Sequence, residues 1–367
     1  VVPETSASSE EVLLVATFGS KVVAARGQKI FTADAGGSSW TEIDTGRTSA
    51  GTYDFERFNF DGNDKLIVVD GNNAPTVFNT SFSATDVSES SVSGAKFVTA
   101  FKDHMFYAGK SSTPQEVIFS QPFDEDAFSS GSGAGSVKVD DTVTGLKVFR
   151  DNLFIFCENR IFQMTGSSSS DFAVKPVTRN IGCVNGQTIQ EFAGDLIFLA
   201  ADGLRTVAGT ARIGDVELGT ISIPVQSFFN ENIMSADNFV SLVIPNKTQY
   251  RLFFTKTGTA EASTEGVLCS LRGQAFEFAK IKGIRATATD TVPTTATSAP
   301  PSIVIHGGEG GYIYRQEVGN DFDGTDMSAI YRGPDYTMGD AGIRKMMQRI
   351  IWNYDNEGAV NSNFRIR

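Results

Sequence analysis

Two copies of one short pattern, both between Thr144 and Val207, constrain the fold of this chain more than any other feature. Each copy reads as strand, polar turn, hydrophobic strand, polar turn and strand, and the first turns fall within Phe149–Leu153 and Phe192–Leu196. Asp, Asn and Gly between short runs of β-branched and aromatic residues are typical of antiparallel hairpins. A repeated three-strand meander predicts an array, so further copies are expected elsewhere in the chain.

Further copies are found along most of the chain. Aligned on the apolar residue before the first polar turn, they fall at Ala25, Phe60, Phe101, Phe149, Phe192, Ile244 and Ile305. Successive spacings run from 35 to 61 residues. A period of about 40 to 50 residues with about four strands per unit is that of a β-propeller blade, whereas a β-sandwich has no repeat of this length. The sequence therefore predicts an all-β protein, a β-propeller of about seven antiparallel blades, with six as the alternative.

The predicted domain organisation follows from where this pattern begins and ends. Residues 1–11 are small and polar and are predicted to be an N-terminal tail or connection, and residues 12–328 form the propeller. From 329 to 367 the pattern changes, which predicts the start of a C-terminal β extension or second domain. The chain starts without Met and ends within a strand-like run, so we expect it to be part of a longer polypeptide.

Two segments inside the predicted propeller differ from the blade pattern. Residues 222–234 are predicted to form a short helix with Pro224 in its first turn, where the missing N–H costs nothing. The segment 116–128 reads as a strand that ends in an acidic, aromatic loop, and the Gly/Ser-rich segment 129–136 after it predicts a flexible connection.

Charge and hydropathy exclude some classes of partner. The 31 basic and 43 acidic residues give a net charge of −12. A duplex-DNA binder needs a basic stripe, so sequence-independent DNA binding is not predicted. An acidic wall past which DNA slides without adhering remains compatible with this charge. No run of 18 apolar residues occurs, so no membrane-spanning helix is predicted.

The number and spacing of the cysteines and histidines predict no metal site, no cofactor site and no set of disulfide bonds. Cys157, Cys183 and Cys269 are far apart and odd in number, which suits assembly in a reducing cytoplasm. Cys157 lies in an apolar run and is predicted to be a small buried hydrophobe. His104 and His306 are predicted to be turn residues and not metal ligands.

One stretch near the N-terminus resembles the Asp-box of sialidases and related propellers. It runs from Thr32 to Thr41 and contains Asp34, Gly36 and Trp40, although the Trp comes one residue late. The resemblance implies a blade hairpin whose turn is shaped by Asp and Gly and whose Trp packs between blades. The box is structural and does not imply sialidase chemistry.

A second resemblance concerns the middle of the chain. Phe149–Gly166, Gly182–Gly186, Leu196–Arg205 and Ile223–Gln226 resemble phage tail propeller proteins, the family that includes the tail nozzle (tail tubular protein B-like) and tail-stabilisation proteins of tailed bacteriophages. The resemblance covers residues 101–229 well and the rest by pattern only. It implies a virion protein that forms a ring, commonly a hexamer, below the tail adaptor, lines the DNA exit channel and can hold tail fibres. Nozzle proteins usually carry extra platform domains, which this chain does not show.

The resemblance therefore gives the functional expectation. The chain is expected to be a structural, non-enzymatic propeller subunit of the tail nozzle or conduit in a tailed-phage virion, assembled in the bacterial host cytoplasm. Its expected partners are copies of itself in a ring, tail adaptor and tail fibre proteins, and passing phage DNA that it does not bind sequence-specifically. No catalytic, cofactor-binding or metal-binding residue is assigned.

The alternative is a carbohydrate-binding or glycan-cleaving propeller. Cleavage would require paired carboxylates and, for a sialidase, an arginine cluster in the central cavity. Five arginines are available, but the pattern does not bring them together: Arg150, Arg160, Arg179, Arg205 and Arg251. A cellular protein-binding scaffold is the third reading, although neither a WD dipeptide nor a Kelch double-glycine signature recurs.

Overall fold

The structure of the protein is a computed structural model. It describes residues 2–3, 11–34, 37, 39–48, 51–207, 220–232, 236–256, 264–273, 275–293, 302–319, 321–322, 325–326, 342, 344 and 346. The chain divides into two compact units, residues 1–316 and 317–367.

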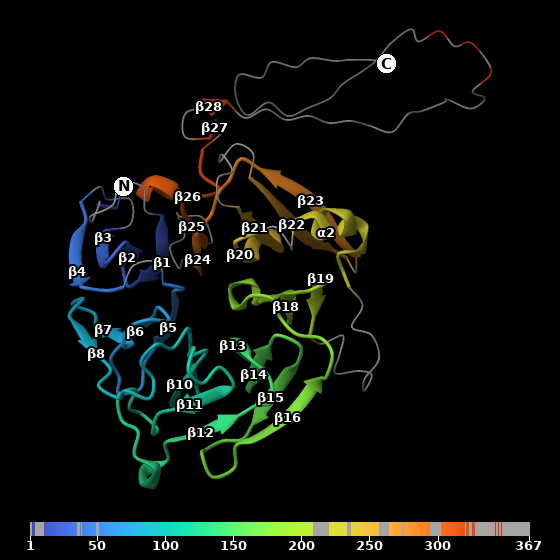
Figure 1. The fold of residues 1–367 in the computed structure, drawn as a ribbon. Coiled ribbons are helices and arrows are strands. Elements are labelled where there is room, and N and C mark those ends of the chain that lie inside the picture. The colour runs from blue at the N-terminus through green and yellow to red at the C-terminus, as the bar shows by residue number, and fades with distance from the viewer. Residues whose placement is uncertain are drawn as a thin grey trace. The chain divides into compact units, whose positions relative to one another are not determined.

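The first unit is a seven-bladed β-propeller, as the sequence predicts. Its sheets follow one another around a circle in chain order, from blue to orange in Figure 1. Each sheet contains only strands that are consecutive in the chain, and every strand pair is antiparallel. The prediction of an all-β propeller with about seven blades is therefore confirmed.

The first four blades have four strands each. Blade 1 contains β1 (Val12–Phe18), β2 (Lys21–Arg26), β3 (Lys29–Asp34) and β4 (Thr41–Thr45). Blade 2 contains β5 (Asp54–Phe58), β6 (Lys65–Val69), β7 (Thr76–Phe78) and β8 (Ala84–Asp86). Blade 3 contains β9 (Phe97–Phe101), β10 (His104–Ala108), β11 (Glu116–Phe119) and β12 (Gly135–Lys138). Blade 4 contains β13 (Val143–Phe149), β14 (Asn152–Cys157), β15 (Ile161–Thr165) and β16 (Ala173–Thr178).

The remaining blades have three or four described strands. Blade 5 contains β17 (Gln190–Phe192), β18 (Asp195–Ala200) and β19 (Gly203–Thr206). Blade 6 contains β20 (Asn238–Ile244), β21 (Gln249–Thr255), β22 (Glu265–Arg272) and β23 (Ala275–Lys282). Blade 7 contains β24 (Ala288–Pro293), β25 (Ser302–Gly307) and β26 (Ile313–Arg315). The first strand of each blade, from β1 to β24, lies nearest the propeller axis (Figure 1).

The predicted alignment of the repeats is wrong by one strand at the two outer copies. Ala25 precedes the turn between β2 and β3, and Ile305 lies within β25, so neither marks the end of a first strand. In blade 1 the equivalent position is Phe18, and from Phe18 to Phe60 is 42 residues, close to the spacing of the inner copies. The error arose because Arg26-Gly27 reads as a polar turn just as Gly19-Ser20 does.

Two-residue turns with left-handed backbone connect the first and second strands of the middle blades. Lys102 and Asp103 have φ of 48° and 63°, and Arg150 and Asp151 have φ of 47° and 60°. Two consecutive residues with positive φ form the hairpin turn whose twist matches the strands on either side. A salt bridge connects the turn of blade 3 to the turn of blade 4, because Lys102 Nζ lies 3.5 Å from Asp151 Oδ1.

Close backbone contacts between blades 4 and 5 explain why the segment Gly182–Gly186 has glycine at both ends. A Cβ on Gly182 would overlap the Cys157 carbonyl oxygen and the backbone of Glu158 at the end of β14. A Cβ on Gly186 would overlap the Thr144 carbonyl oxygen in the same way. Both glycines are therefore required for the connection to lie against the preceding blade.

Gly182→Ala should lower the free energy of unfolding by about 1–3 kcal/mol, the usual cost of forcing extra volume into a packed site. The clashing atoms are backbone and cannot move aside as a side chain would. Urea unfolding followed by circular dichroism measures the change. Gly131→Ala is the matched control, because its Cβ would meet only Ser129 Oγ, at 3.9 Å. Equal stability of the two variants would contradict this account.

Among the described residues no sheet contains strands from both ends of the chain, and backbone hydrogen bonds, side-chain hydrogen bonds and packing close the ring. Asp290 of blade 7 accepts a hydrogen bond from Thr17 N of blade 1 at 2.7 Å and pairs with the guanidinium of Arg57 from blade 2. Thr287 Oγ1 donates to Val12 O at 2.6 Å, and Val12 N donates to Gly308 O at 3.2 Å. Blades 7, 1 and 2 are thus joined at the axis by a single buried carboxylate.

Apolar side chains fill the space between neighbouring blades. One such core lies between blades 1 and 7 and includes Val15, Phe31 and Ile305, with the half-buried Trp40 packed against it. The Asp-box resemblance implied this position for the Trp. Gly37 N donates to Asp34 O at 2.7 Å in the same hairpin, and Gly36 lies outside the described residues.

The predicted helix is present, and the segment predicted to be flexible contains a short turn and the start of a strand. A 3₁₀ turn at Ile223–Val225, with Pro224 in its first turn, leads into α2 (Gln226–Asn232), whose Phe228 and Phe229 are buried. The Gly/Ser-rich segment 129–136 forms a 3₁₀ turn at Ser130–Ser132 and the start of β12. Glycine is needed in β12 because a Cβ on Gly135 would lie 2.8 Å from the Phe119 ring.

The segments outside the blades are described only in part. Of the N-terminal residues 1–11, Val2 is buried and its N–H donates to Gly311 O at 2.8 Å. In the second unit β27 (Asp321–Phe322) pairs with β28 (Thr325–Asp326). Nearly all of residues 329–367 lie outside the described residues, so the boundary at 329 and the β extension stay predictions. No helix among the described residues is long and apolar enough to cross a membrane.

Candidate functional site: the axial cavity

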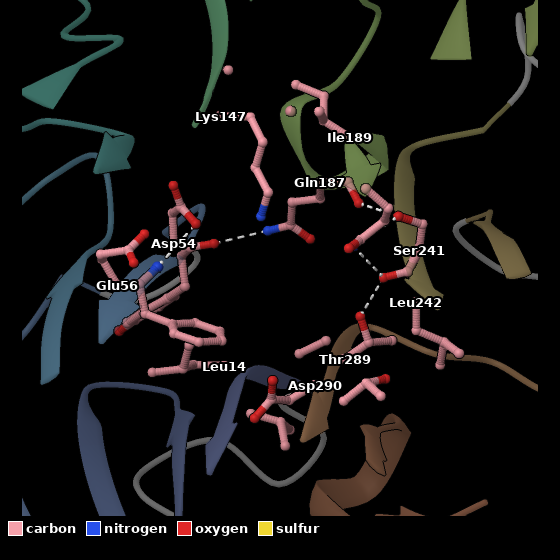
Figure 2. A pocket seen from close by; sticks show the side chains of 18 of the residues that line it. Leu14, Asp54, Glu56, Lys147, Gln187, Ile189, Ser241, Leu242, Thr289 and Asp290 are labelled. Atoms are coloured by element: carbon pink, nitrogen blue, oxygen red, sulfur yellow. Dashed lines mark hydrogen bonds between the residues drawn. The ribbon is translucent and has the colours of Figure 1, made fainter. Parts of the chain in front are cut away.

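The inner strands of all seven blades surround a cavity of about 410 Å³ on the propeller axis (Figure 2). Its walls combine apolar and polar side chains. Leu14, Ile189 and Leu242 are apolar lining residues from three different blades. The polar lining residues include Asp54, Glu56, Lys147, Gln187, Ser241 and Asp290.

Two carboxyl groups lie on one face of β5. Side chains alternate along a strand, so Asp54 and Glu56 both point toward β9. Asp54 accepts hydrogen bonds from Phe55 N at 2.9 Å and Val98 N at 3.1 Å. Glu56 Oε2 accepts from Thr99 Oγ1 at 3.3 Å.

Burial changes the ionisation of both groups. It raises the pKa of Asp54 to about 6, against the opposing effect of the two backbone hydrogen bonds. It raises the pKa of Glu56 to about 7, where the charge of Lys147 acts in the opposite direction. A carboxyl group removed from water favours its neutral form, so both sites take up protons in mildly acidic solution.

Lys147 extends into the cavity from β13. Figure 2 shows its side chain pointing toward Asp54 and Gln187. The side chain is half-buried, and its ammonium group makes no hydrogen bond or ion pair with any residue that the structure describes. Its charge nevertheless acts on Asp54 and Glu56.

A chain of hydrogen bonds fixes the opposite side of the cavity. Gln187 Nε2 donates to Tyr53 O at 2.8 Å, and Ser241 Oγ donates to Gln187 O at 2.7 Å. Thr289 Oγ1 then donates to Ser241 O at 2.7 Å. These contacts join blades 2, 5, 6 and 7 and hold the lining side chains in one arrangement (Figure 2).

The five arginines considered for glycan cleavage do not line the cavity. Arg150 donates to Gly194 O at 2.6 Å, and Arg160 pairs with the exposed Asp140. Arg205 pairs with Asp202, three residues before it. Arg251 donates to Gln316 Oε1 at 2.9 Å, and Arg179 is exposed. The expectation that they would not come together is confirmed for the cavity.

The prediction that both histidines are turn residues is wrong. His104 is buried at the start of β10, with Nδ1 2.6 Å from Ser120 O and its ring against Phe119. His306 is buried in β25 and stacked on Tyr314, and burial lowers its pKa to about 4. Both rings fill core positions. Among the described residues, no group of three His, Cys, Asp or Glu side chains is placed to hold a metal ion.

The cysteines lie in the core. Cys157, Cys183 and Cys269 are free and fully buried. Burial raises the pKa of the Cys183 thiol to about 11 and that of the Cys269 thiol to about 12. The prediction that Cys157 is a small buried hydrophobe is confirmed.

Sequence reasoning missed the residues of the cavity. A signal was present, since Asp54-Phe55-Glu56-Arg57 places three charges in a segment that must be an inner strand if Phe60 marks the following turn. Charged residues in a strand surrounded by other strands need a reason. Lys147 and Gln187 carry no such local signal, because their proximity to β5 depends on ring closure.

A second polar feature is the loop Pro122–Asp126, called here the acidic-aromatic loop. Phe123 is 59% exposed at its tip and has φ of 64°. Its N–H donates to Asp103 O at 2.8 Å in the β9–β10 turn. Asp124 and Asp126 on either side of Glu125 are exposed.

The loop is held in place by contacts to blades 2 and 3. Glu125 is buried and pairs with Lys65 Nζ at 2.8 Å, and its carbonyl oxygen accepts from Tyr107 Oη at 2.9 Å. Asp126 Oδ1 accepts from Ser88 N at 2.6 Å. An exposed aromatic residue is therefore presented on a well-anchored loop.

Comparison with known proteins shows the fold alone. No family model and no curated protein matches the chain. The extracellular domain of a putative one-component system from B. thetaiotaomicron aligns with a TM-score of 0.52 at 8% identity, over 84% of this chain and 38% of that one. A chain of the mitotic checkpoint complex aligns with a TM-score of 0.50 at 11% identity, over 81% of this chain and 86% of that one.

PorZ, a surface component of the type-IX secretion system of Porphyromonas gingivalis, aligns with a TM-score of 0.47 at 11% identity over 86% of this chain. The chain spans 39% of that protein and 38% of the one-component-system domain. None of these three is a phage tail protein. The likeness to the one-component-system domain and to the checkpoint-complex chain supports the propeller and carries no activity, substrate or partner to this chain.

The cavity carboxyls should make stability depend on pH. Their pKa values in the folded protein lie above the ordinary 3.8 and 4.5, so the folded state binds more protons between about pH 4 and pH 7. Their contribution to the free energy of unfolding is therefore fully present at low pH and is lost as pH rises through this window, by up to about 1.4 kcal/mol per pH unit for each group.

We compare wild type with the Asp54→Asn/Glu56→Gln variant. The free energy of unfolding of wild type should increase relative to that of the variant as pH falls from about 7.5 to about 5. Urea unfolding at both pH values measures it, and the opposite effect of His306 cancels because both proteins contain it. Asp140→Asn, at an exposed carboxylate, is the control and should show a much smaller shift. A difference that is independent of pH would contradict the assigned ionisation.

Proposed function

We propose that the protein is a structural, non-enzymatic propeller subunit of a phage tail nozzle or conduit. In this role it forms a ring with copies of itself, hexameric by the family's usual number, and docks tail adaptor and fibre proteins. The observation that carries the proposal is the set of sequence phrases between residues 149 and 226 that resemble phage tail propeller proteins.

The positions of these phrases support the proposal. Phe149–Gly166 runs from the end of β13 through β15, and Leu196–Arg205 covers most of β18 and β19. Gly182–Gly186 is the connection whose glycines let blade 5 approach blade 4. These sequence segments therefore form turns and contacts between blades. Similar segments in phage tail propeller proteins would be expected if the two share this architecture.

The small size of the axial cavity excludes passage of DNA through the propeller itself. A cavity of about 410 Å³, lined by side chains from every inner strand, has no room for a duplex. In the proposed role DNA therefore passes through the middle of a ring of subunits, and the wall of that channel is the outer surface of each propeller. A net charge of −12 would limit adhesion of the phosphate backbone to this wall.

The acidic-aromatic loop is the proposed docking element. Exposed aromatic residues that can enter a partner's pocket are common centres of binding energy. Phe123 needs little ordering on binding because its loop is already anchored by Lys65, Tyr107 and Ser88. The flanking carboxylates of Asp124 and Asp126 suit a partner pocket with a basic rim.

The proposed location is the virion tail, after assembly in the host cytoplasm. Three free, buried thiols suit folding under reducing conditions. The alternative function, a carbohydrate-binding propeller, is favoured by one observation, the carboxyl groups that face the axial cavity.

Light scattering of the purified protein, alone and mixed with purified phage tail adaptor and fibre proteins, tests the proposal. We expect a ring, either alone or on the adaptor. Phe123→Ala should weaken association with a tail protein by at least tenfold without changing the melting temperature, since the side chain is exposed.

Ile223→Ala is the matched control, because Ile223 is also a large apolar residue, 69% exposed, in another blade region. It should leave association unchanged. A protein that stays monomeric with every tail component would contradict the proposed function. Equal effects of the two substitutions would contradict the role of the loop.

A further inference from the structure

The axial cavity contains hydrogen-bonding groups that the protein itself leaves without a partner. The Lys147 ammonium carries three N–H donors and makes no hydrogen bond within the described part of the chain. An ammonium group that lines a cavity and has no protein partner is free to bind a ligand or water.

Acceptors face the same space. Glu56 uses one carboxylate oxygen for Thr99 Oγ1, and its Oε1 accepts nothing from the described residues. Each oxygen of Asp54 accepts one backbone hydrogen bond, which leaves each with a further lone pair. The acceptors Asp54 and Glu56 on β5 and the donor Lys147 on β13 therefore line one cavity (Figure 2).

The charges around the cavity argue against a charged ligand. An anion would meet the carboxyl groups of Asp54, Glu56 and Asp290. A cation would meet Lys147 and Arg57 from the other side. A neutral molecule with several hydroxyl groups avoids both penalties, because a hydroxyl can donate to a carboxylate and accept from an ammonium group.

The size and the apolar lining of the cavity fit the same class of ligand. About 410 Å³ lies at the small end of the range for small-molecule sites. Leu14, Ile189 and Leu242 offer apolar contact for the C–H faces of a ring. The Gln187–Ser241–Thr289 hydrogen bonds hold the wall before any ligand arrives, which lowers the entropic cost of binding.

We propose that the axial cavity binds an uncharged polyhydroxylated molecule of monosaccharide size, whose hydroxyl groups donate to Asp54 and Glu56 and accept from Lys147 Nζ. The site lies within one propeller and does not depend on ring assembly or on the tail role. This proposal assigns the alternative function, carbohydrate recognition, to the axial cavity and to the residues that would form hydrogen bonds with the sugar hydroxyl groups.

Saturation-transfer NMR and calorimetry on the 367-residue protein test the site with free D-glucose, D-galactose, D-mannose, L-fucose and N-acetyl-D-glucosamine as probes. We expect at least one of them to bind with millimolar affinity or better. At pH 8, where the raised pKa of Glu56 leaves most of its carboxyl groups ionised, Lys147→Met and Glu56→Gln should each weaken that binding by about tenfold or more, because each loses hydrogen bonds to a charged group.

Arg160→Met is the matched control, since it removes a half-exposed cation that pairs with Asp140 outside the cavity, and it should leave affinity unchanged. Melting temperatures show that each variant is folded. If Lys147→Met does not fold, Glu56→Gln alone tests the site.

Three results would overturn the proposal. One is no binding of any probe sugar. Another is binding that Lys147→Met and Glu56→Gln leave unchanged, which would place the sugar elsewhere on the protein. The third is tighter binding of putrescine or of inorganic phosphate than of every sugar, which would assign the cavity to a charged ligand. None of these depends on whether the protein associates with tail components, so the tail proposal and this one can fail separately.

Discussion

The ring is closed at its axis by the carboxylate of Asp290, which contacts blades 1 and 2 from blade 7. Every described sheet is built from strands that are consecutive in the chain, so no described strand pair joins blade 7 to blade 1. Asp290 contributes to that connection by accepting from Thr17 N while it pairs with Arg57 of blade 2, and the hydrogen bond from Val12 N to Gly308 O adds to it. A buried carboxylate that loses one partner becomes costly, so the three groups favour the closed arrangement together. The apolar core around Val15 and Ile305 adds the packing that a hydrogen bond alone would not supply.

The axial cavity follows from this closure. Its lining residues are far apart in the chain, and they meet only because the ring brings every inner strand to the axis. Asp54 and Glu56 are then removed from water beside Lys147, which explains both the raised pKa values and the opposing effect of the lysine. The same geometry leaves no room for a duplex on the axis. Structural assembly and ligand binding would therefore use different surfaces, the outer loops for the first and the cavity for the second.

The sequence predicts the fold well where turn chemistry and strand pattern agree. The turns at Arg150-Asp151 and Ala193-Gly194 are predicted from the sequence and are present in the structure. The separation of these two turns along the chain corresponds to one blade. Blade 1 was misaligned because two consecutive turns there have similar residues, and period alone cannot choose between them. The cavity could not be predicted, since Lys147 and Gln187 are ordinary strand and loop residues until closure places them near β5. The buried positions of His104 and His306 were missed for the same reason, as aromatic neighbours from other strands surround them.

Hydrogen–deuterium exchange along the inner strands tests the closed ring most directly. The Thr17 amide should exchange slowly because Asp290 accepts its hydrogen bond, and β1 and β24 as a whole should be protected as well as β9 and β13. Slow exchange in all four strands would support a propeller whose first and last blades are joined at the axis. Fast exchange confined to β1 and β24 would contradict it, because it would show that the ring opens between its first and last blades.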